Sequence, residues 1–365
     1  MQKIHNAKMN KMKKLTIILI TVILIAVFLW IRIASDRPID GISAATIQVN
    51  GNSMYHSSEG FKMKAGSLEV VGEVASPGMV SLEKLYMHEV VIKESKVIND
   101  SVVFIGAYRY TGYSLLDILN PFLLQKKNAE QFRPVIDTYV EIENASGERI
   151  VFSWSEIFHT NNLHQVLIAT GGSQVNPHKK TVDYPKDTDW KIVASGDLRN
   201  SRQLVNPTKI TVRSFDRKEY AIQRNMKPLH SPSIKIVIED GQTAQIDNNH
   251  GKDMRTYETL FYGMGMGYHP SGSFRGPALD EVLKGSVTID DELLRTGLLC
   301  FVSVDGYRSI FSCSELFNRT DQVSPILDES NDESDGGRFR IFLPSDFFAD
   351  RSVKALKEIY IFRVK

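Results

Sequence analysis

The sequence predicts an α+β fold in which two tandem domains follow one N-terminal transmembrane helix. Two observations predict it: a long run without charged side chains follows a basic N-terminus, and one order of strands, turns and helices then occurs twice. The predicted parts are a cytoplasmic basic tail at residues 1–14, a transmembrane anchor at 15–33, a stalk at 34–65, and two domains at 66–214 and 230–365.

The N-terminal segment has the charge pattern of a membrane anchor. Leu15 to Ile31 contains no charged residue, and at about 1.5 Å per residue a helix ending near Ile33 covers roughly 30 Å of hydrocarbon. Trp30 and Arg32 are placed to anchor the far end of this helix at the interface. Because the basic flank stays in the cytoplasm, we expect the C-terminal bulk of this single-pass protein to lie outside the cell membrane. The lysines of the flank are Lys3, Lys8, Lys11, Lys13 and Lys14.

A cleaved signal peptide is the alternative interpretation of this segment. It would need a shorter apolar run followed at once by small residues near the cut. Cleavage after Ala34 would place Arg32 at the third position before the cut, and the small residues 43–45 lie too far beyond the apolar run. The sequence therefore favours a retained anchor.

Charge and cysteine content exclude several classes of protein. The formal net charge is +1, which gives no electrostatic case for binding nucleic acid. The two cysteines, Cys300 and Cys313, are too few for a disulfide framework or a four-thiolate metal site. They flank a predicted hairpin that turns at Asp305 and Gly306, and strand alternation places both on one face. An oxidising compartment would allow a disulfide between them, but the interpretation as two small buried hydrophobic residues is favoured.

Each predicted domain follows one plan of elements. An alternating strand comes first, an aromatic-x-Gly turn leads into a helix, and a hairpin runs into a second helix that starts at a serine. The matching segments are residues 68–74 and 234–240 for the strand, 110–119 and 274–283 for the turn and helix, 138–153 and 299–312 for the hairpin, and 153–158 and 312–317 for the second helix start. Two halves with one plan predict an internal duplication.

The ends of the two domains match best. An aspartate and an arginine five residues apart are flanked by isoleucines at equal distances in both domains. Because this acidic and basic pair occurs twice, we interpret it as a structural pair that holds the fold rather than as a ligand site. The matched residues are Ile192, Asp197, Arg202 and Ile210 in the first domain and Ile341, Asp346, Arg351 and Ile359 in the second.

Taken in this order, the elements resemble the molybdopterin-binding domain of the sulfite oxidase family. The first domain retains the Gly-x-Val strand at residues 71–74, the turn at 111–113 and the segment 197–202. Together the two domains cover about four fifths of the chain. In the second domain the family's pattern is found at residues 274–276 (aromatic-x-Gly), 305–308 (Asp-Gly-Tyr-Arg), 314–316 (Ser-Glu-Leu), 340–344 (Arg to Pro) and 351–354 (Arg-x-Val-Lys).

The resemblance implies a pterin cofactor in a cleft beside the aromatic-x-Gly turn and the Arg-x-Val-Lys segment. Guanidinium groups suit a phosphate or a pyranopterin tail. The resemblance assigns to this site Arg275, Gly276, Tyr307, Arg308, Arg340, Arg351 and Lys354.

The match differs from the catalytic members of the family at the metal ligand. Those members hold molybdenum through a cysteine thiolate about a dozen residues before the aromatic-x-Gly turn. The corresponding positions here, residues 99–102 and 263–266, contain no cysteine. Molybdenum ligation and sulfite-oxidase-type turnover are therefore not expected, although molybdopterin or another anion could still occupy the cleft.

Three further segments contain residues that could bind a ligand. Residues 262–270 alternate glycine with methionine before His269 and could bind copper or haem, but tight strand packing is the favoured interpretation. His159 and His164 lack the spacing of a helical metal site and are interpreted as solvated loop residues. The acidic run at 328–337 lacks the ligand spacing of an EF-hand and predicts a surface loop.

These observations predict a membrane-anchored, extracytoplasmic binding or assembly module that is not catalytic and serves a membrane redox complex or another membrane complex. Both domains keep the skeleton of the family while the metal-binding thiol is absent, and this combination favours the prediction. The alternative is an oxidoreductase that binds a molybdopterin-type cofactor through ligands other than cysteine. A different small anion in the cleft is a third interpretation.

Overall fold

The computed structural model describes residues 60–98, 101–175, 189–249, 251–260, 262–265, 267–268, 272–330 and 337–364. The predicted tail, the anchor at 15–33 and nearly all of the stalk lie outside these residues. No helix in the described part of the chain is long and apolar enough to cross a membrane. Both predicted domains belong to one compact unit of the chain. The fold is mixed and rich in sheet with short helices, in agreement with the broad α+β class.

We call the parts of the chain that hold the predicted domains at 66–214 and 230–365 the first half and the second half. The first half contains a five-stranded sheet that includes strands from both ends of its predicted domain. Its strand order is β3-β2-β11-β6-β7, in which β2 and β11 are parallel and the other neighbours are antiparallel. The strands are β2 (Glu69–Gly72), β3 (Gly78–Met79), β6 (Thr138–Asn144), β7 (Arg149–Ser153) and β11 (Pro207–Ser214).

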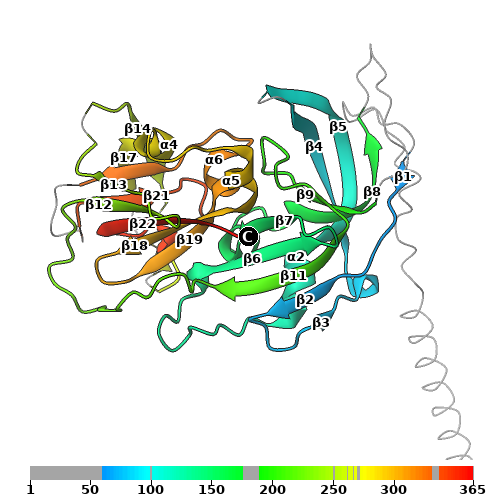
Figure 1. Ribbon diagram of the computed structural model, residues 1–365, viewed down its shortest axis with the longest axis horizontal. Helices are drawn as coiled ribbons and strands as arrows, with labels where there is room; N and C mark the ends of the chain where they lie inside the picture. Colours follow the sequence, from blue (N-terminus) through cyan, green and yellow to red (C-terminus); the bar gives the residue numbers. More distant parts are fainter. Residues whose placement is uncertain are drawn as a thin grey trace, which may run out of the picture. The chain divides into compact units, whose positions relative to one another are not determined.

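The second half contains a sheet of the same order and directions. The order is β13-β12-β22-β18-β19, with β12 and β22 parallel and the other neighbours antiparallel, and Figure 1 shows these strands side by side. Ile210 pairs with Val70, and Ile359 pairs with Ile236, so the isoleucines matched in the sequence hold equivalent places. The strands are β12 (Ile234–Ile238), β13 (Thr243–Ile246), β18 (Gly297–Ser303), β19 (Arg308–Ser312) and β22 (Leu356–Arg363).

A second sheet in the first half has the order β10-β9-β8-β5-β4, with β1 paired to β8. The second half has β14 paired to β17 and β20 paired to β21, and the Ala278–Ile326 bridge brings the end of β17 to β20. The strands are β1 (Phe61–Lys62), β4 (Met87–Ile98), β5 (Ser101–Ser114), β8 (Val166–Gln174), β9 (Lys191–Ala194), β10 (Leu204–Val205), β14 (Met254–Thr259), β15 (Tyr262–Gly263), β16 (Gly267–Tyr268), β17 (Gly272–Pro277), β20 (Ile326–Glu329) and β21 (Phe339–Phe342).

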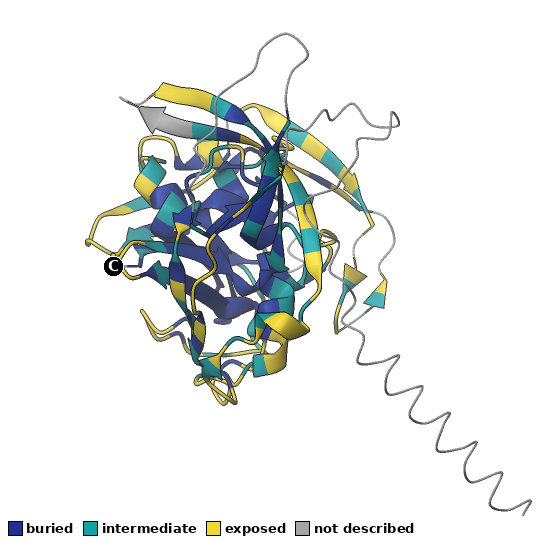
Figure 2. Cartoon of the chain, turned by 90° about the vertical axis from the view of Figure 1, so that its right-hand side faces the viewer, coloured by how far each residue is buried: buried dark blue, intermediate teal, exposed yellow. Residues whose placement is uncertain are grey.

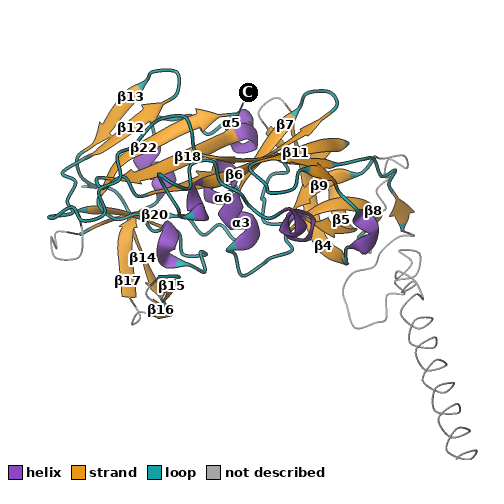
Figure 3. Cartoon of the chain, turned by 90° about the horizontal axis from the view of Figure 1, so that it is seen from below, coloured by secondary structure: helices purple, strands orange, loops and turns teal. Residues whose placement is uncertain are grey.

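The helices are short, and two of them start at the predicted serines. Ser153 and Ser312 each form a capping box with Glu156 and Glu315, respectively. The serine hydroxyl accepts from the backbone N–H of the glutamate, and the glutamate carboxylate accepts from the backbone N–H of the serine. Figure 3 shows these helices, α3 and α6, near the centre of the sheet-rich unit. The helices are α2 (Leu115–Leu119), α3 (Trp154–Phe158), α4 (Leu279–Leu283), α5 (Asp291–Thr296) and α6 (Cys313–Phe317), with 3-10 turns η1 (Leu82–Lys84), η2 (Asn120–Phe122), η3 (Val135–Asp137) and η5 (Ala349–Arg351).

The hydrophobic core continues from one half into the other. Each half has a cluster of its own, and a third cluster combines Tyr139 and Phe215 of the first half with Leu298 and Phe362 of the second. Figure 2 shows this buried interior, whereas the start of β5, residues 101–104, is exposed. Because apolar side chains of both halves are buried together, the halves stabilise each other.

The two aromatic-x-Gly glycines lie where a side chain cannot fit. A Cβ on Gly112 would lie 2.0 Å from the carbonyl oxygen of Ile168, and one on Gly276 would lie 2.2 Å from that of Leu327. Both neighbours are backbone atoms of the adjacent strand, so they cannot rotate away. The turn therefore requires glycine for close approach of two strands.

We predict that Gly276→Ala and Gly112→Ala each lower the free energy of unfolding by about 1–3 kcal/mol, because the added methyl group forces the strands apart. Chemical denaturation of the full chain in detergent measures this change. Gly78→Ala is the matched control, since its Cβ would meet no atom within 4 Å. Equal stability of all three variants would contradict the proposed close approach.

Candidate functional site

An ion cluster, buried except at the partly exposed Asp346, lies where the two halves meet, and it contains the aspartate and arginine pairs predicted from the sequence. We call it the central cluster. In the first half, Arg202 donates to both oxygens of Asp197, at 2.9 and 2.6 Å, and to both oxygens of Glu156, at 2.9 and 3.0 Å. Its guanidinium also lies 4.1 Å from the centre of the Phe152 ring. The members of the cluster are Glu156, Asp197, Arg202, Glu315, Asp346 and Arg351.

The second half has the same arrangement with looser contacts. Arg351 lies 2.9 Å from Glu315 and 3.4 Å from Asp346, and its guanidinium stacks 3.7 Å from the centre of the Phe311 ring. Its Nε, although buried, has no hydrogen-bond partner among the described residues. The pairing of Asp197 with Arg202 and of Asp346 with Arg351 is thus observed in both halves, but only Arg202 is fully bonded.

Hydrogen bonds across the cluster connect the two halves. Arg202 donates to the hydroxyl of Ser312, the N-cap of α6, at 3.1 Å. The Asn318 side chain donates to the carbonyl of Arg199 at 2.7 Å and accepts from its N–H at 2.8 Å. On the other side, the ring of His159 packs edge-on against Phe348, with 5.8 Å between centroids. The central cluster is therefore also the junction of the halves.

Carboxylates outnumber guanidinium groups in the central cluster, four to two by its membership. Burial, reinforced by the neighbouring Glu315 and Asp197 carboxylates, raises the pKa of Glu156 above its usual range. Burial raises the pKa of Asp346 to about 7, because its 3.4 Å contact with Arg351 compensates only partly for lost hydration. The cluster therefore favours bound protons or cations over anions.

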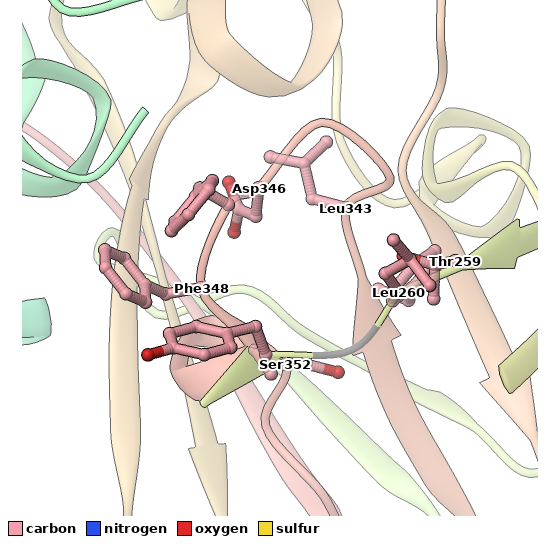
Figure 4. A pocket seen from close by; sticks show the side chains of 10 residues that line it. Thr259, Leu260, Leu343, Asp346, Phe348 and Ser352 are labelled. Atoms are coloured by element: carbon pink, nitrogen blue, oxygen red, sulfur yellow. The ribbon is translucent and has the colours of Figure 1, made fainter. Parts of the chain in front are cut away.

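Two hollows adjoin the central cluster. A cleft of about 290 Å³ is lined from both halves, including Glu156 and Arg202 on one side and Glu315 and Arg319 on the other. A smaller cavity of about 10 Å³ lies beside Asp346, between Leu343, Phe348 and Thr259, as Figure 4 shows. That volume is close to what a single water needs.

The arginines assigned to a cofactor by the resemblance do not converge on one cleft. Arg308 is buried and contacts Asp137 of the first half, with Nε and a terminal nitrogen at 3.0 and 2.9 Å from one carboxylate oxygen. Arg351 belongs to the central cluster. The two lie on opposite faces of β19, because Arg308 shares a face with Ile310 whereas Arg351 stacks on Phe311.

Arg275, Gly276, Arg340 and Lys354 form a separate group, whereas Tyr307 packs edge-on against Phe132, the ring that Arg308 also faces. Arg340 and Lys354 pair across an isolated bridge, and the backbone N–H of Arg275 donates to Asp328 on the neighbouring strand at 3.1 Å. The Arg340 guanidinium lies 5.3 Å from the centre of the Phe274 ring. Gly276 makes the close strand approach described above. Tyr307 donates through its hydroxyl to the carbonyl of Asp350 at 2.8 Å.

Both cysteines are free and buried. Cys300 belongs to the core cluster shared by the halves, whereas Cys313 belongs to the core of the second half. The expectation that they share one face is not met, because Cys300 pairs with Ile310 and not with Phe311, so Cys313 follows the alternation of Phe311 toward the other core. Burial raises the pKa of both thiols, which disfavours the thiolate that soft metal ligation requires.

The two histidines near α3 have different environments. Burial, together with the positive charge of Arg351, lowers the pKa of His159 to about 4. His164 meets His88 and Asp117, a group that spacing along the chain did not reveal because His88 is remote in sequence. His269 and Met266 of the glycine and methionine segment lie outside the described residues, as does most of the acidic run 328–337.

Neither known protein families nor curated proteins match this chain.

We predict that Arg202→Met lowers the free energy of unfolding by about 3–5 kcal/mol, because it leaves buried carboxylates without their counter-charge. Arg363→Met is the matched control, since Arg363 pairs with Asp290 in an exposed position and should contribute less than about 1 kcal/mol. Denaturant unfolding of the full chain in detergent gives both values. Similar losses in the two variants would rule out a special role for the central cluster.

We predict that stability falls as the pH rises from about 4 to 7, in part through Asp346. Because the folded state raises the pKa of this carboxyl, it binds the proton more tightly than the unfolded chain does, and the stabilisation is lost once the proton leaves. Asp346→Asn should flatten this dependence by up to roughly 4 kcal/mol across the window. Unfolding curves at several pH values measure the slope, and an unchanged slope in the variant would contradict the raised pKa.

Proposed function

We propose that the chain is a membrane-anchored, extracytoplasmic binding or assembly module built from two tandem sulfite-oxidase-like domains, and that it is not catalytic. The two five-stranded sheets share strand order and directions, and each half carries one aspartate, arginine and capping glutamate. These equivalences support descent of both halves from one domain.

The observation that carries the proposal is the pairing of two of the arginines that the resemblance assigns to a cofactor. Arg308 and Arg351 are both buried against carboxylates of the fold, and their charges are neutralised there. A phosphate or pterin tail at Arg351 would have to displace Glu315 and leave that carboxylate buried without its partner, which costs several kcal/mol. Arg308 is therefore assigned to joining the two halves, and Arg351 to holding the fold of the second half.

The alternative function is an oxidoreductase with a molybdopterin-type cofactor and ligation without cysteine. The specific observation in its favour is the proximity of Arg340 and Lys354, whose backbones pair beside the strands that follow the aromatic-x-Gly turn. Two cationic side chains at such a position suit an anionic tail. In this alternative, Arg275 would lie on the neighbouring strand.

We predict that the full chain fractionates with membranes and that the purified protein contains neither molybdenum nor tungsten in stoichiometric amount. Elemental analysis by mass spectrometry and fluorescence assay of oxidised pterins test this on protein from its native membrane. Stoichiometric metal with pterin would overturn the non-catalytic module and establish the alternative. Recovery in the soluble fraction would contradict the anchor.

If pterin is found, Arg340→Gln tests where it binds. Loss of pterin from this variant, with its retention in Arg308→Gln, would place the cofactor beside Arg340 and Lys354. Thermal unfolding of each variant shows whether the loss reflects binding or folding.

A further inference from the structure

Two imidazoles and one carboxylate meet in the first half, outside the central cluster. His88 comes from β4, Asp117 from α2, and His164 from the segment between α3 and β8. One ligand atom from each lies within 4.8 Å of the other two. Three elements that are distant along the chain therefore bring together three groups able to bind a metal ion.

The group is ordered by its own contacts. The rings of His88 and His164 stack with 3.8 Å between centroids and an angle of 9° between their planes. Asp117 Oδ2 lies 2.7 Å from His88 Nε2 and 3.8 Å from His164 Nδ1. Both edges of the stacked pair thus face one carboxylate oxygen.

Ser114 fixes the position of this carboxylate relative to His164. Its hydroxyl accepts from the backbone N–H of Asp117 as the N-cap of α2, at 3.2 Å. The same oxygen lies 3.0 Å from His164 Nδ1. Binding of an ion by Nδ1 of His164 would exchange this contact with Ser114 for the ion, while Ser114 remains the N-cap of α2.

We propose that His88, Asp117 and His164 form a binding site for Zn²⁺. Two imidazole nitrogens and one carboxylate oxygen are a common three-ligand set for this ion and leave a fourth position for water or an outer ligand. The side chains are 24%, 24% and 40% exposed, respectively, so the group is half-buried and an ion can reach it from solvent. The site is independent of the function proposed above.

The distances need to change little to accept the ion, but the stacked rings must tilt. Tetrahedral ligands at about 2.0–2.1 Å from zinc lie roughly 3.3 Å from one another. His88 Nε2 and Asp117 Oδ2 must therefore separate from 2.7 Å, and His164 Nδ1 must approach the same oxygen from 3.8 Å. Each change is about half an ångström. Because the lone pair of an imidazole nitrogen lies in the ring plane, the rings must also rotate about χ2 out of their parallel stack so that both nitrogens point at the ion.

A metal-free hydrogen-bonded group is the competing explanation. The 2.7 Å distance between His88 and Asp117 is a hydrogen bond when no ion is present. That bond alone does not require His164, whose ring is held against His88 on the same edge of the carboxylate. Convergence of a second imidazole is what favours a metal ion over a simple pair.

The test is a titration of the EDTA-treated full chain in detergent with ZnCl₂ by isothermal calorimetry. We expect one site of micromolar or tighter affinity that depends on these three residues. His88→Ala, Asp117→Asn and His164→Gln should each weaken it by at least about tenfold. His230→Gln, in the loop before β12, is the matched control and should leave the affinity unchanged.

A second measurement separates binding from folding. Because Zn²⁺ binds the folded state, it should raise the melting temperature of the parent protein and of His230→Gln. It should raise the melting temperature of the variants at His88, Asp117 and His164 less. Circular dichroism without metal identifies any variant that does not fold. If only some variants fold, the affinity of His164→Gln decides the test, because His164 is the most exposed of the three ligands. Equal affinity for Zn²⁺ in the parent and in the folded variants at His88, Asp117 and His164, or no binding of Zn²⁺ by the parent, would overturn the proposal.

Discussion

The interaction of Arg202 with Asp197 and Glu156 is the constraint on which the junction of the two halves depends. Removing a guanidinium and two carboxylates from water is costly, and the cost is offset only when nearly every donor and acceptor is bonded. Arg202 meets this condition by adding the Val151 carbonyl and the Ser312 hydroxyl to its two carboxylates. Because Ser312 belongs to the other half, complete bonding of Arg202 requires both halves in place.

The second half has the same arrangement, but its arginine lies farther from the aspartate. Arg351 occupies the equivalent place, yet its contact with Asp346 is 3.4 Å, whereas Arg202 reaches Asp197 at 2.6 Å. The weaker contact is consistent with the raised pKa of Asp346 and with the small cavity beside it. The pair of Arg202 with Asp197 is thus tight and the pair of Arg351 with Asp346 is loose, and the loose pair has the greater freedom to respond to pH or to a bound molecule.

Local features of this fold could be predicted from the sequence, because they depend on residues close together in the chain. The capping boxes at Ser153 and Ser312, both hairpins and the spacing of Asp197 from Arg202 are of this kind. The ion pair of Arg308 with Asp137 could not be predicted, because its partners belong to different halves.

The same limit applies to the candidate sites. The group of His88, Asp117 and His164 assembles from β4, α2 and a loop, so no spacing rule for a single helix or loop finds it. Cys313 was misplaced on the face of Cys300 because the turn at Asp305 and Gly306 was expected to hold two residues, whereas the observed strands pair Cys300 with Ile310. A shift of one residue in register moves every side chain of a strand to the opposite face.

The sign of the charge at the junction restricts what the cleft can bind. A site for a pterin phosphate needs uncompensated positive charge, whereas the central cluster has carboxylates in excess and compensates both of its arginines. In a low-dielectric interior this excess attracts protons or cations and opposes anions more strongly than it would in water. This chain has Arg202 and Arg308 engaged across the junction of its two halves. Its binding chemistry is therefore to be sought at surfaces and sites that this junction leaves accessible.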